Sequence, residues 1–222
     1  MQENISHKAQ ELEQNGYFFN RAYYLRKAWD LISPHWLILS SYTAIYIVFL
    51  IVLLRAPQIG QILQMIIAGP ISAGYYLSIS RLMRGEELRF EHFFDGFKMF
   101  LPTMLASMLS GLFISIGIML FIIPGVFLAI IYLFVLPLVI YAKLDFWPAM
   151  ESSRIILTKN FWEAAIFALM ILGINLLGLL ALGIGVFITI PLSYAMILMA
   201  YEDIYGFEEE EENITNDFSH FR

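Results

Sequence analysis

Apolar residues occur along this chain in blocks of about twenty, separated by short polar or turn-forming segments. A helix of that length crosses a hydrocarbon core of about 30 Å. The blocks predict six membrane-spanning helices, at residues 36–54, 59–80, 100–122, 126–142, 161–182 and 185–201. The fold class expected is therefore an all-α integral membrane protein, with residues 17–205 as its six-helix membrane domain.

Three of the breaks between the blocks are very short and are rich in proline and glycine. They lie at Ala56-Pro57, at Pro124-Gly125 and at Gly183–Gly185. Proline and glycine stop one helix and start the next within a few residues. The pattern predicts three helical hairpins joined at these turns.

A polar segment precedes each hairpin and places its apolar side chains at helical spacing. These segments, 17–33, 86–98 and 145–160, predict amphipathic helices in the headgroup plane. Each of Glu151, Arg154 and Lys159 would cost about 2.5–3.5 kcal/mol at the bilayer centre, which a short segment cannot offset. The residues expected to contact lipid headgroups are Arg26, Lys27, Arg84, Arg89, Lys98, Arg154, Lys159, Trp29, Trp147 and Trp162.

The three hairpins also predict an internal repeat of 60 to 65 residues. Trp36, Phe100 and Trp162 open the odd-numbered spans, and a proline lies inside each even-numbered span, at positions 70, 137 and 191. Chance matches among glycines and prolines are the alternative explanation. Each unit would begin and end on the same side of the membrane, so the repeats are parallel and indicate a pseudo-threefold axis along the membrane normal.

Composition supports the membrane assignment and narrows the function. The chain is 59% hydrophobic and 14% charged, whereas soluble domains have about 25% charged residues. Its net charge of −6 comes mostly from five consecutive glutamates, Glu208 to Glu212, in an acidic tail at 206–222. A basic footprint for nucleic acid is lacking. Residues 1–16 are polar, and with no cysteine the chain cannot form disulfides or thiolate metal sites.

Lys and Arg are distributed unevenly between the two ends of the predicted spans. Arg55 alone lies among the three hairpin turns. The segments before the hairpins carry Lys8, Arg21, Arg26, Lys27, Arg81, Arg84, Arg89, Lys98, Lys143, Arg154 and Lys159. Cytoplasmic loops carry the excess of Lys and Arg, so both termini are expected in the cytoplasm.

The sequence contains no recognisable catalytic or cofactor-binding motif. The four histidines lie in separate segments, and the sequence has no H-E-x-x-H, G-x-S-x-G or P-loop pattern. Ser152 and Ser153 have no neighbouring His-Asp set, so they are interpreted as helix or capping residues. The expectation is a protein that is not an enzyme and uses no cofactor or metal.

The deepest strongly polar residues of the spans are Gln64 and Asn175. Gln58, Gln61 and Gln64 recur every three residues at the start of the second span, and Asn175 lies within the fifth. They could line a polar crevice. The favoured alternative is hydrogen bonding between helices, which polar side chains supply inside membranes.

Three stretches carry a family resemblance: IIPGVF, then VLPLVIYAKLDFWPAMESSRIILTKNFW, and finally IPLSYAMILMAYEDIY. Over residues 25–205 they resemble a superfamily of bacterial six-helix membrane proteins. It includes the YciC-like proteins and the membrane domain fused to some glycerophosphodiester phosphodiesterases. The superfamily's pattern A-x-x-S-x-x-x-x-x-x-x-N-x-W is matched by Ala149, Ser152, Asn160 and Trp162. The resemblance implies a bacterial cytoplasmic-membrane protein of largely unassigned function and carries over no catalytic residues.

Two functions from different classes are consistent with the sequence. The first is a membrane scaffold or accessory subunit that contacts lipid headgroups, with the acidic tail as a candidate site for a protein partner. The alternative is a small transporter or lipid-handling protein with a crevice among the proline-containing even spans. A crevice lined by Gln64 and Asn175 would favour the alternative, and a bundle filled with apolar side chains would favour the first.

Overall fold

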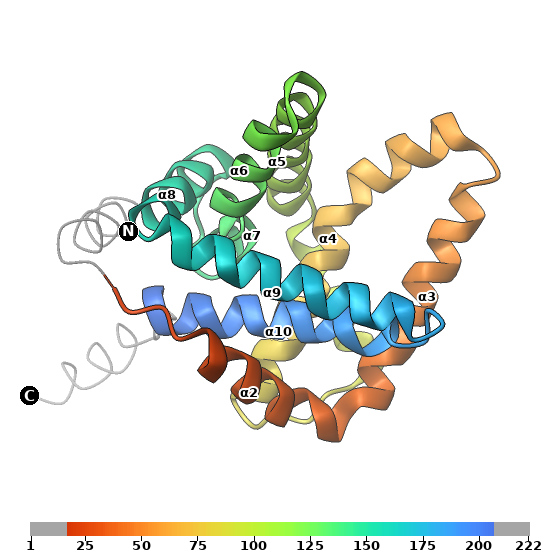
Figure 1. Ribbon diagram of the computed structural model, residues 1–222. Helices are drawn as coiled ribbons and strands as arrows, with labels where there is room; N and C mark the ends of the chain where they lie inside the picture. The colour runs from red at the N-terminus through yellow and green to blue at the C-terminus, as the bar shows by residue number, and fades with distance from the viewer. Residues whose placement is uncertain (1–16, 207–222) are drawn as a thin grey trace, which may run out of the picture.

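The computed structural model describes residues 17–206, and within that range the chain is helical, without strands. Figure 1 shows the helices in chain order. Their bounds are α2 Arg21–Ile32, the 3-10 turn η1 Ser33–His35, α3 Trp36–Leu53, α4 Pro57–Met83, the 3-10 helix η2 Phe90–Met99, α5 Phe100–Leu120, α6 Ile122–Ile131, α7 Val135–Ile140, α8 Phe146–Lys159, α9 Phe161–Leu180 and α10 Val186–Tyr205. The predicted polar segment 1–16 and nearly all of the acidic tail lie outside the described residues.

Six helical stretches among these residues are long and apolar enough to cross a membrane, which confirms the all-α membrane class. They form hairpin one (α3 and α4), hairpin two (α5, with α6 and α7) and hairpin three (α9 and α10). Figure 1 shows the turns of the three hairpins pointing in different directions, with the turn of hairpin three beside α3. Each is preceded by a lead-in segment: α2, η2 or α8.

Two predicted boundaries were wrong for local reasons. Pro124 lies within the first turn of α6. The amides of a first helical turn have no partner inside the helix, so proline's missing amide proton costs no hydrogen bond there. The turn of hairpin two is therefore the single residue Phe121. The lead-in expected as a helix over 86–98 is extended at its start. It becomes a 3-10 helix only from Phe90, after Gly85 at φ 71° has ended the preceding helix.

The even and odd spans differ in burial. In the apolar window of α4, α6–α7 and α10, 50, 44 and 56% of residues are buried, against 17, 22 and 22% for the spans of α3, α5 and α9. The even spans therefore form the centre of the molecule. The odd spans lie outside them, and most of their residues are not buried.

The packing between hairpins follows one rule around the molecule. Each lead-in and the odd helix after it pack on the even helix of the hairpin before: η2 and α5 on α4, α8 and α9 on α6, and α2 and α3 on α10. Because the first hairpin closes onto the third, the order forms a ring. The sequence repeat itself stays a prediction, and a cyclic order is the arrangement that three parallel repeats would produce.

The centre of the ring is filled by aromatic side chains. The rings of Tyr75 and Tyr194 stack at 4.5 Å, Tyr76 packs edge-on against Tyr194 at 5.1 Å, and Phe134 packs edge-on against Tyr201. Their hydroxyls bond locally: that of Tyr194 with Ser72 and that of Tyr75 with Thr43. Buried phenol groups normally find such partners, and here neighbouring helices supply them: α4 for Tyr194 and α3 for Tyr75.

Two glycines allow η2 to lie backbone to backbone on α4. A Cβ atom on Gly74 would overlap the carbonyl oxygen of Phe93 in η2. A Cβ atom on Gly96 would overlap the carbonyl oxygen of Pro70 and lie 2.5 Å from the amide nitrogen of Gly74. Only glycine fits at these positions, so the lead-in η2 is held tightly to α4 of hairpin one.

Candidate functional site: the charged rim and the hairpin turns

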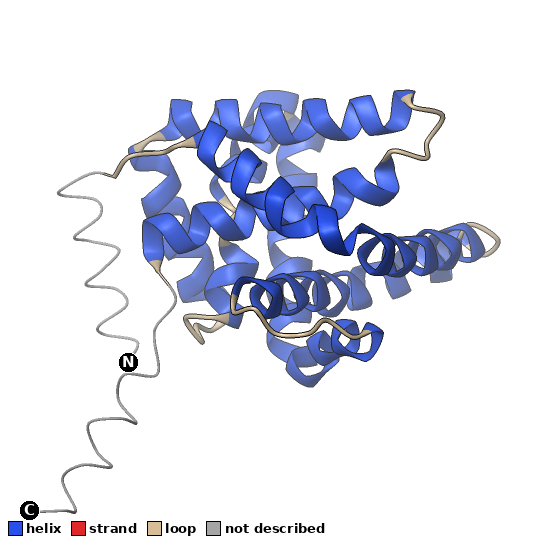
Figure 2. Ribbon diagram, turned by 90° about the horizontal axis from the view of Figure 1, so that it is seen from below, coloured by secondary structure: helices blue, strands red, loops and turns tan. Residues whose placement is uncertain are grey.

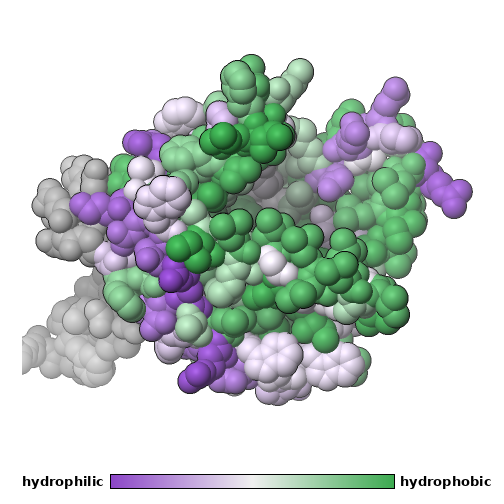
Figure 3. Space-filling model, in the orientation of Figure 1, coloured by the Kyte–Doolittle hydropathy of each residue, from purple (hydrophilic) through white to green (hydrophobic). Residues whose placement is uncertain are grey.

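Charged side chains gather on one side of the molecule. In Figure 3 a hydrophilic band runs from α8 past the beginning of α9 to α2, while the hairpins beyond it are mostly hydrophobic. Ion pairs join the elements of this rim: Arg21 to Glu163 at 2.6 Å and Lys27 to Glu202 at 3.1 Å. These pairs tie the first lead-in to both helices of hairpin three.

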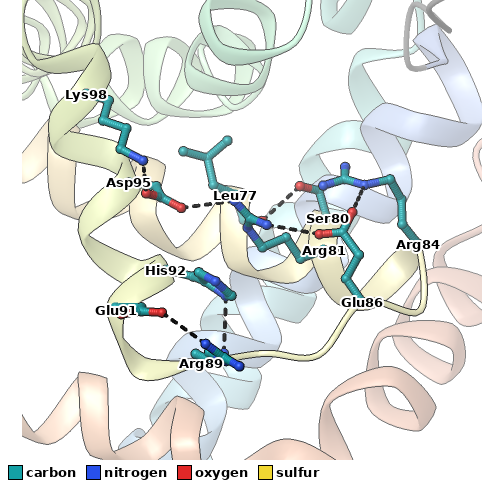
Figure 4. Close-up of polar contacts among 10 residues, drawn as sticks. All are labelled: Leu77, Ser80, Arg81, Arg84, Glu86, Arg89, Glu91, His92, Asp95 and Lys98. Carbon is teal, nitrogen blue, oxygen red and sulfur yellow. Dashed lines mark hydrogen bonds and ion pairs between the residues drawn. The ribbon is translucent and has the colours of Figure 1, made fainter.

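A second group of ion pairs holds η2 to the end of α4 (Figure 4). Arg81 bridges two carboxylates, with Nη1 donating to Glu86 Oε2 at 3.0 Å and Nη2 donating to Asp95 Oδ2 at 3.1 Å. Arg84 also donates to Glu86 at 2.6 Å, and Lys98 lies 2.6 Å from Asp95. The basic residues here neutralise neighbouring carboxylates first, which leaves less of their charge for headgroups.

Arg81 is more enclosed than the other cations of this group, at 32% exposure of its side chain against 56% for Arg84. We expect Arg81→Met to lower the free energy of unfolding by about 1–2 kcal/mol, because Asp95 would lose a charged donor in a partly enclosed place. Arg84→Met is the matched control and should change it by about 0.5 kcal/mol or less. Thermal unfolding in detergent measures both. Equal losses would show that enclosure does not matter here.

The carboxyl of Glu86 has a pKa below its usual value because Arg84 donates a hydrogen bond to it, with Arg81 adding to the effect. A lowered pKa in the folded state stabilises the fold above the unfolded pKa of about 4.3, and the contribution is lost as pH falls through the lower value. At pH values below about 4, we expect the protection of the amides of residues 85–95 to decrease relative to that of the amides in α9. Glu86→Gln should remove part of this pH dependence. Hydrogen exchange corrected for intrinsic rates measures it, and unchanged protection at pH 3.5 would contradict the expectation.

The third lead-in, α8, is buried along one face and charged along the other. Arg154 and Glu151 pair side by side, and this hydrogen bond holds the pKa of Glu151 below its usual value. With Phe113, Tyr132, Trp147 and Met150 they line a pocket of about 120 Å³. The pocket combines both charge signs with aromatic rings, which suits a small zwitterionic or phosphate-bearing group.

The other residues predicted to contact headgroups lie on the same rim. Trp29, Trp147 and Trp162 are 48, 61 and 77% exposed, and Arg26 and Lys159 are exposed as well. Exposed tryptophans beside cations are typical of the membrane–water boundary. The rim therefore has the composition of a headgroup-facing surface.

The structure assigns Ser153 a role that the sequence did not reveal. The fourth span breaks between α6 and α7 because Pro137 has no amide proton for the carbonyl of Leu133. The Ser153 hydroxyl, from α8, donates to the carbonyl of Ile131 at 2.6 Å and accepts from the amide of Phe134 at 3.2 Å. This hydroxyl satisfies backbone groups on both sides of the break, so Ser153, inside α8, joins that helix to the fourth span.

The four residues predicted to line a polar crevice lie on two different helices, α4 and α9. Gln58, Gln61 and Gln64 all lie on the exposed first half of α4. The side-chain amide of Asn175, on α9, donates to Ser193 Oγ on α10 at 2.6 Å and to the carbonyl of Ile171 at 2.9 Å. Asn175 thus takes the interhelical alternative, with its donors used inside hairpin three.

Replacing Asn175 should cost little. We expect Asn175→Leu to destabilise the protein by about 0.6 kcal/mol, the average for interhelical hydrogen bonds in membranes. Gln61→Leu, at an exposed position of α4, is the control. The measurement is the unfolding midpoint in detergent; a loss well above 2 kcal/mol would mean that Asn175 supports more than its hairpin.

The turns of the hairpins differ in polarity. Hairpin one turns at Arg55 and Gln58, whereas hairpin two turns through Leu120, Phe121, Ile122 and Ile123, which are 68 to 83% exposed in the protein alone. The turn of hairpin three is equally apolar, with Leu180, Leu182 and Ile184 at 78, 91 and 67% exposure. Burying a large apolar side chain away from water is favourable by about 1.5–3 kcal/mol, so these two turns favour a hydrocarbon environment.

Two contacts bring a hairpin turn beside the base of the next hairpin. Ser40 Oγ, in the second turn of α3, donates to the carbonyl of Phe187 at the start of α10 at 3.1 Å. The ring of Phe127, early in α6, lies 5.1 Å from that of Phe161, the first residue of α9. Beside the first contact, Trp36, Leu37, Ser40 and neighbouring residues line an apolar groove of about 350 Å³.

Comparison with known protein families, with curated proteins and with solved structures finds no match to this chain. Among residues 17–206, no group of three His, Asp or Glu side chains is close enough to hold a metal ion.

Proposed function

We propose that this protein is a non-enzymatic membrane scaffold or accessory subunit whose charged rim contacts lipid headgroups. The observation that carries the proposal is the filled centre. Tyr75, Tyr194, Phe134 and Tyr201 occupy the middle of the ring and are almost entirely buried apart from Tyr194, which is half-buried. A transporter with alternating access needs a site near the bilayer midplane instead.

The rim supplies the second part of the proposal. Trp29, Trp147 and Trp162 lie on it together with Arg26 and Lys159, and amphipathic segments of this composition bind anionic membrane surfaces. The proposal places the protein in a bacterial cytoplasmic membrane with both termini in the cytoplasm. The charge distribution and the resemblance to YciC-like proteins support that location. The acidic tail would serve as the site for a protein partner.

A small transporter or lipid-handling protein remains the second candidate. The pocket of Glu151, Arg154 and Trp147 is the observation in its favour, because it could hold a headgroup away from bulk lipid. Gln64 and Asn175 give it less support, since Asn175 is bonded within hairpin three.

The deciding experiment is purification in native-lipid discs followed by mass spectrometry of lipids and proteins. A scaffold should retain a defined protein partner and enriched anionic lipid. Replacing both Arg26 and Lys159 by glutamine should reduce the lipid enrichment. Arg55→Gln, in the turn of hairpin one and away from the rim, should not. Bulk lipid alone, with no protein partner, would contradict the accessory-subunit function.

A further inference from the structure

The contact between hairpins three and one limits how both can lie in a bilayer. Ser40, in the second turn of α3, is bonded to Phe187, which follows the turn of hairpin three directly. The turn of hairpin three therefore lies at the level where hairpin one begins. Helices of about 20 residues are about 30 Å long, so the two hairpins cannot both cross a hydrocarbon core of about 30 Å side by side.

The same relation holds between hairpins two and three. Phe127 lies six residues after the turn residue Phe121, and its ring packs on that of Phe161 at the base of hairpin three. The turn of hairpin two is therefore near the level where hairpin three begins. Of the three hairpins, one can cross fully while the other two lie obliquely.

Polarity selects the hairpin that crosses. Arg55, Gln58, Gln61 and Gln64 make the end of hairpin one suitable for water and headgroups. No polar side chain occurs from Ile116 to Ile131 or from Leu176 to Ile188. These two stretches contain the turns of hairpins two and three.

The backbone of the two apolar turns suits a non-aqueous environment. In the turn of hairpin two, between α5 and α6, the only residue outside helix is Phe121, whose amide donates to the carbonyl of Gly117 at 2.9 Å. In hairpin three the amides of Ala181, Gly183 and Ile184 all donate to carbonyls within the turn or in α9. Inside hydrocarbon, backbone groups must be satisfied internally, and these turns keep much of that bonding.

We infer that only hairpin one crosses the bilayer and that hairpins two and three are embedded obliquely, with their turns inside the hydrocarbon. The partner of these turns is lipid, chiefly that of the leaflet nearest the charged rim. The protein would then occupy more area in that leaflet than in the opposite one. This inference goes beyond the proposed scaffold function and does not depend on it.

The chain has no cysteine, so single cysteines can report the position of each turn. The variants are Gln58→Cys in hairpin one, Ile123→Cys in hairpin two and Leu182→Cys in hairpin three. All three positions are exposed in the protein, so substitution should be tolerated. Each is labelled with a membrane-impermeant maleimide in intact cells and in inverted membrane vesicles, then again after denaturation in SDS to confirm that the thiol reacts.

We expect Gln58→Cys to be labelled from one side of the membrane. Ile123→Cys and Leu182→Cys should react at least tenfold more slowly from both sides and equally fast after denaturation. Met119→Cys and Ile184→Cys, in the same two turns, should repeat the result if either first variant fails to fold. Labelling of the Ile123 and Leu182 variants within twofold of the Gln58 variant, from its side, would overturn the inference. So would a Gln58 variant protected from both sides. Labelling of Gln58→Cys only from the cytoplasm would revise the orientation while supporting the placement of the turns.

Discussion

Gly96→Ala is expected to destabilise the protein by about 3 kcal/mol or more, the upper part of the range for overpacking. The added methyl group would meet the carbonyl of Pro70 and the amide of Gly74, both backbone atoms that no rotamer change can move. Relief would require η2 to shift away from α4, taking the beginning of α5 with it. The unfolding midpoint in detergent, followed by tryptophan fluorescence, should fall by roughly 6–12 °C on the scale of 150–250-residue domains.

The matched control for this change is Gly111→Ala in the middle of α5. A Cβ atom there would meet nothing within 4 Å, and alanine favours helix over glycine by about 0.8–1 kcal/mol. The control should be as stable as the parent or slightly more stable. If Gly96→Ala unfolds within 1 °C of the parent, close packing of η2 on α4 is not a source of stability.

Ser153→Ala should cost about 1–3 kcal/mol, because it would leave the carbonyl of Ile131 and the amide of Phe134 without this partner in an apolar place. The local readout is hydrogen exchange over residues 131–136, which should become faster than in α10. Ser153→Thr keeps a hydroxyl and should retain more protection than alanine does.

Ser41→Ala is the control for the loss of a hydroxyl. Ser41 is exposed and donates only to Ile38 within its own helix, so its removal should change stability by about 0.5 kcal/mol or less. Equal effects of the two alanine variants would contradict a special role for Ser153 at the break in the fourth span.

Length and composition were enough to predict six long apolar helices, because a membrane demands about twenty apolar residues in a row and the chain shows them plainly. The proline- and glycine-rich breaks also predicted the three hairpins. They failed at Pro124, which was interpreted as part of the turn but begins α6, since proline is favoured both beyond one helix and in the first turn of the next. The sequence does not distinguish those two positions.

Contacts between distant segments could not be predicted. Pro137 was visible in the fourth span, yet nothing local showed that the hydroxyl of Ser153 would bond to the carbonyl of Ile131 and the amide of Phe134. The bond of Asn175 with Ser193 followed from the favoured alternative of interhelical bonding, although its partner was unknown. The ring order of the hairpins depends on side-chain fit between helices, such as the glycines of α4 and η2, rather than on any periodic pattern.

The ring has a consequence for the order in which the chain can be completed during synthesis. The lead-ins η2 and α8 pack on helices that the ribosome has already made, but α2 packs on α10, the last of the described helices. Tyr24 bonds to Asp203 and Lys27 to Glu202, across 179 and 175 residues of sequence. At about 5–20 residues per second, roughly ten to forty seconds pass between making the two partners. During that time the face of α2 that carries Tyr24, Ala28 and Ile32 lacks its cover by α10, so this lead-in needs another apolar surface, such as that of the membrane, until α10 is made.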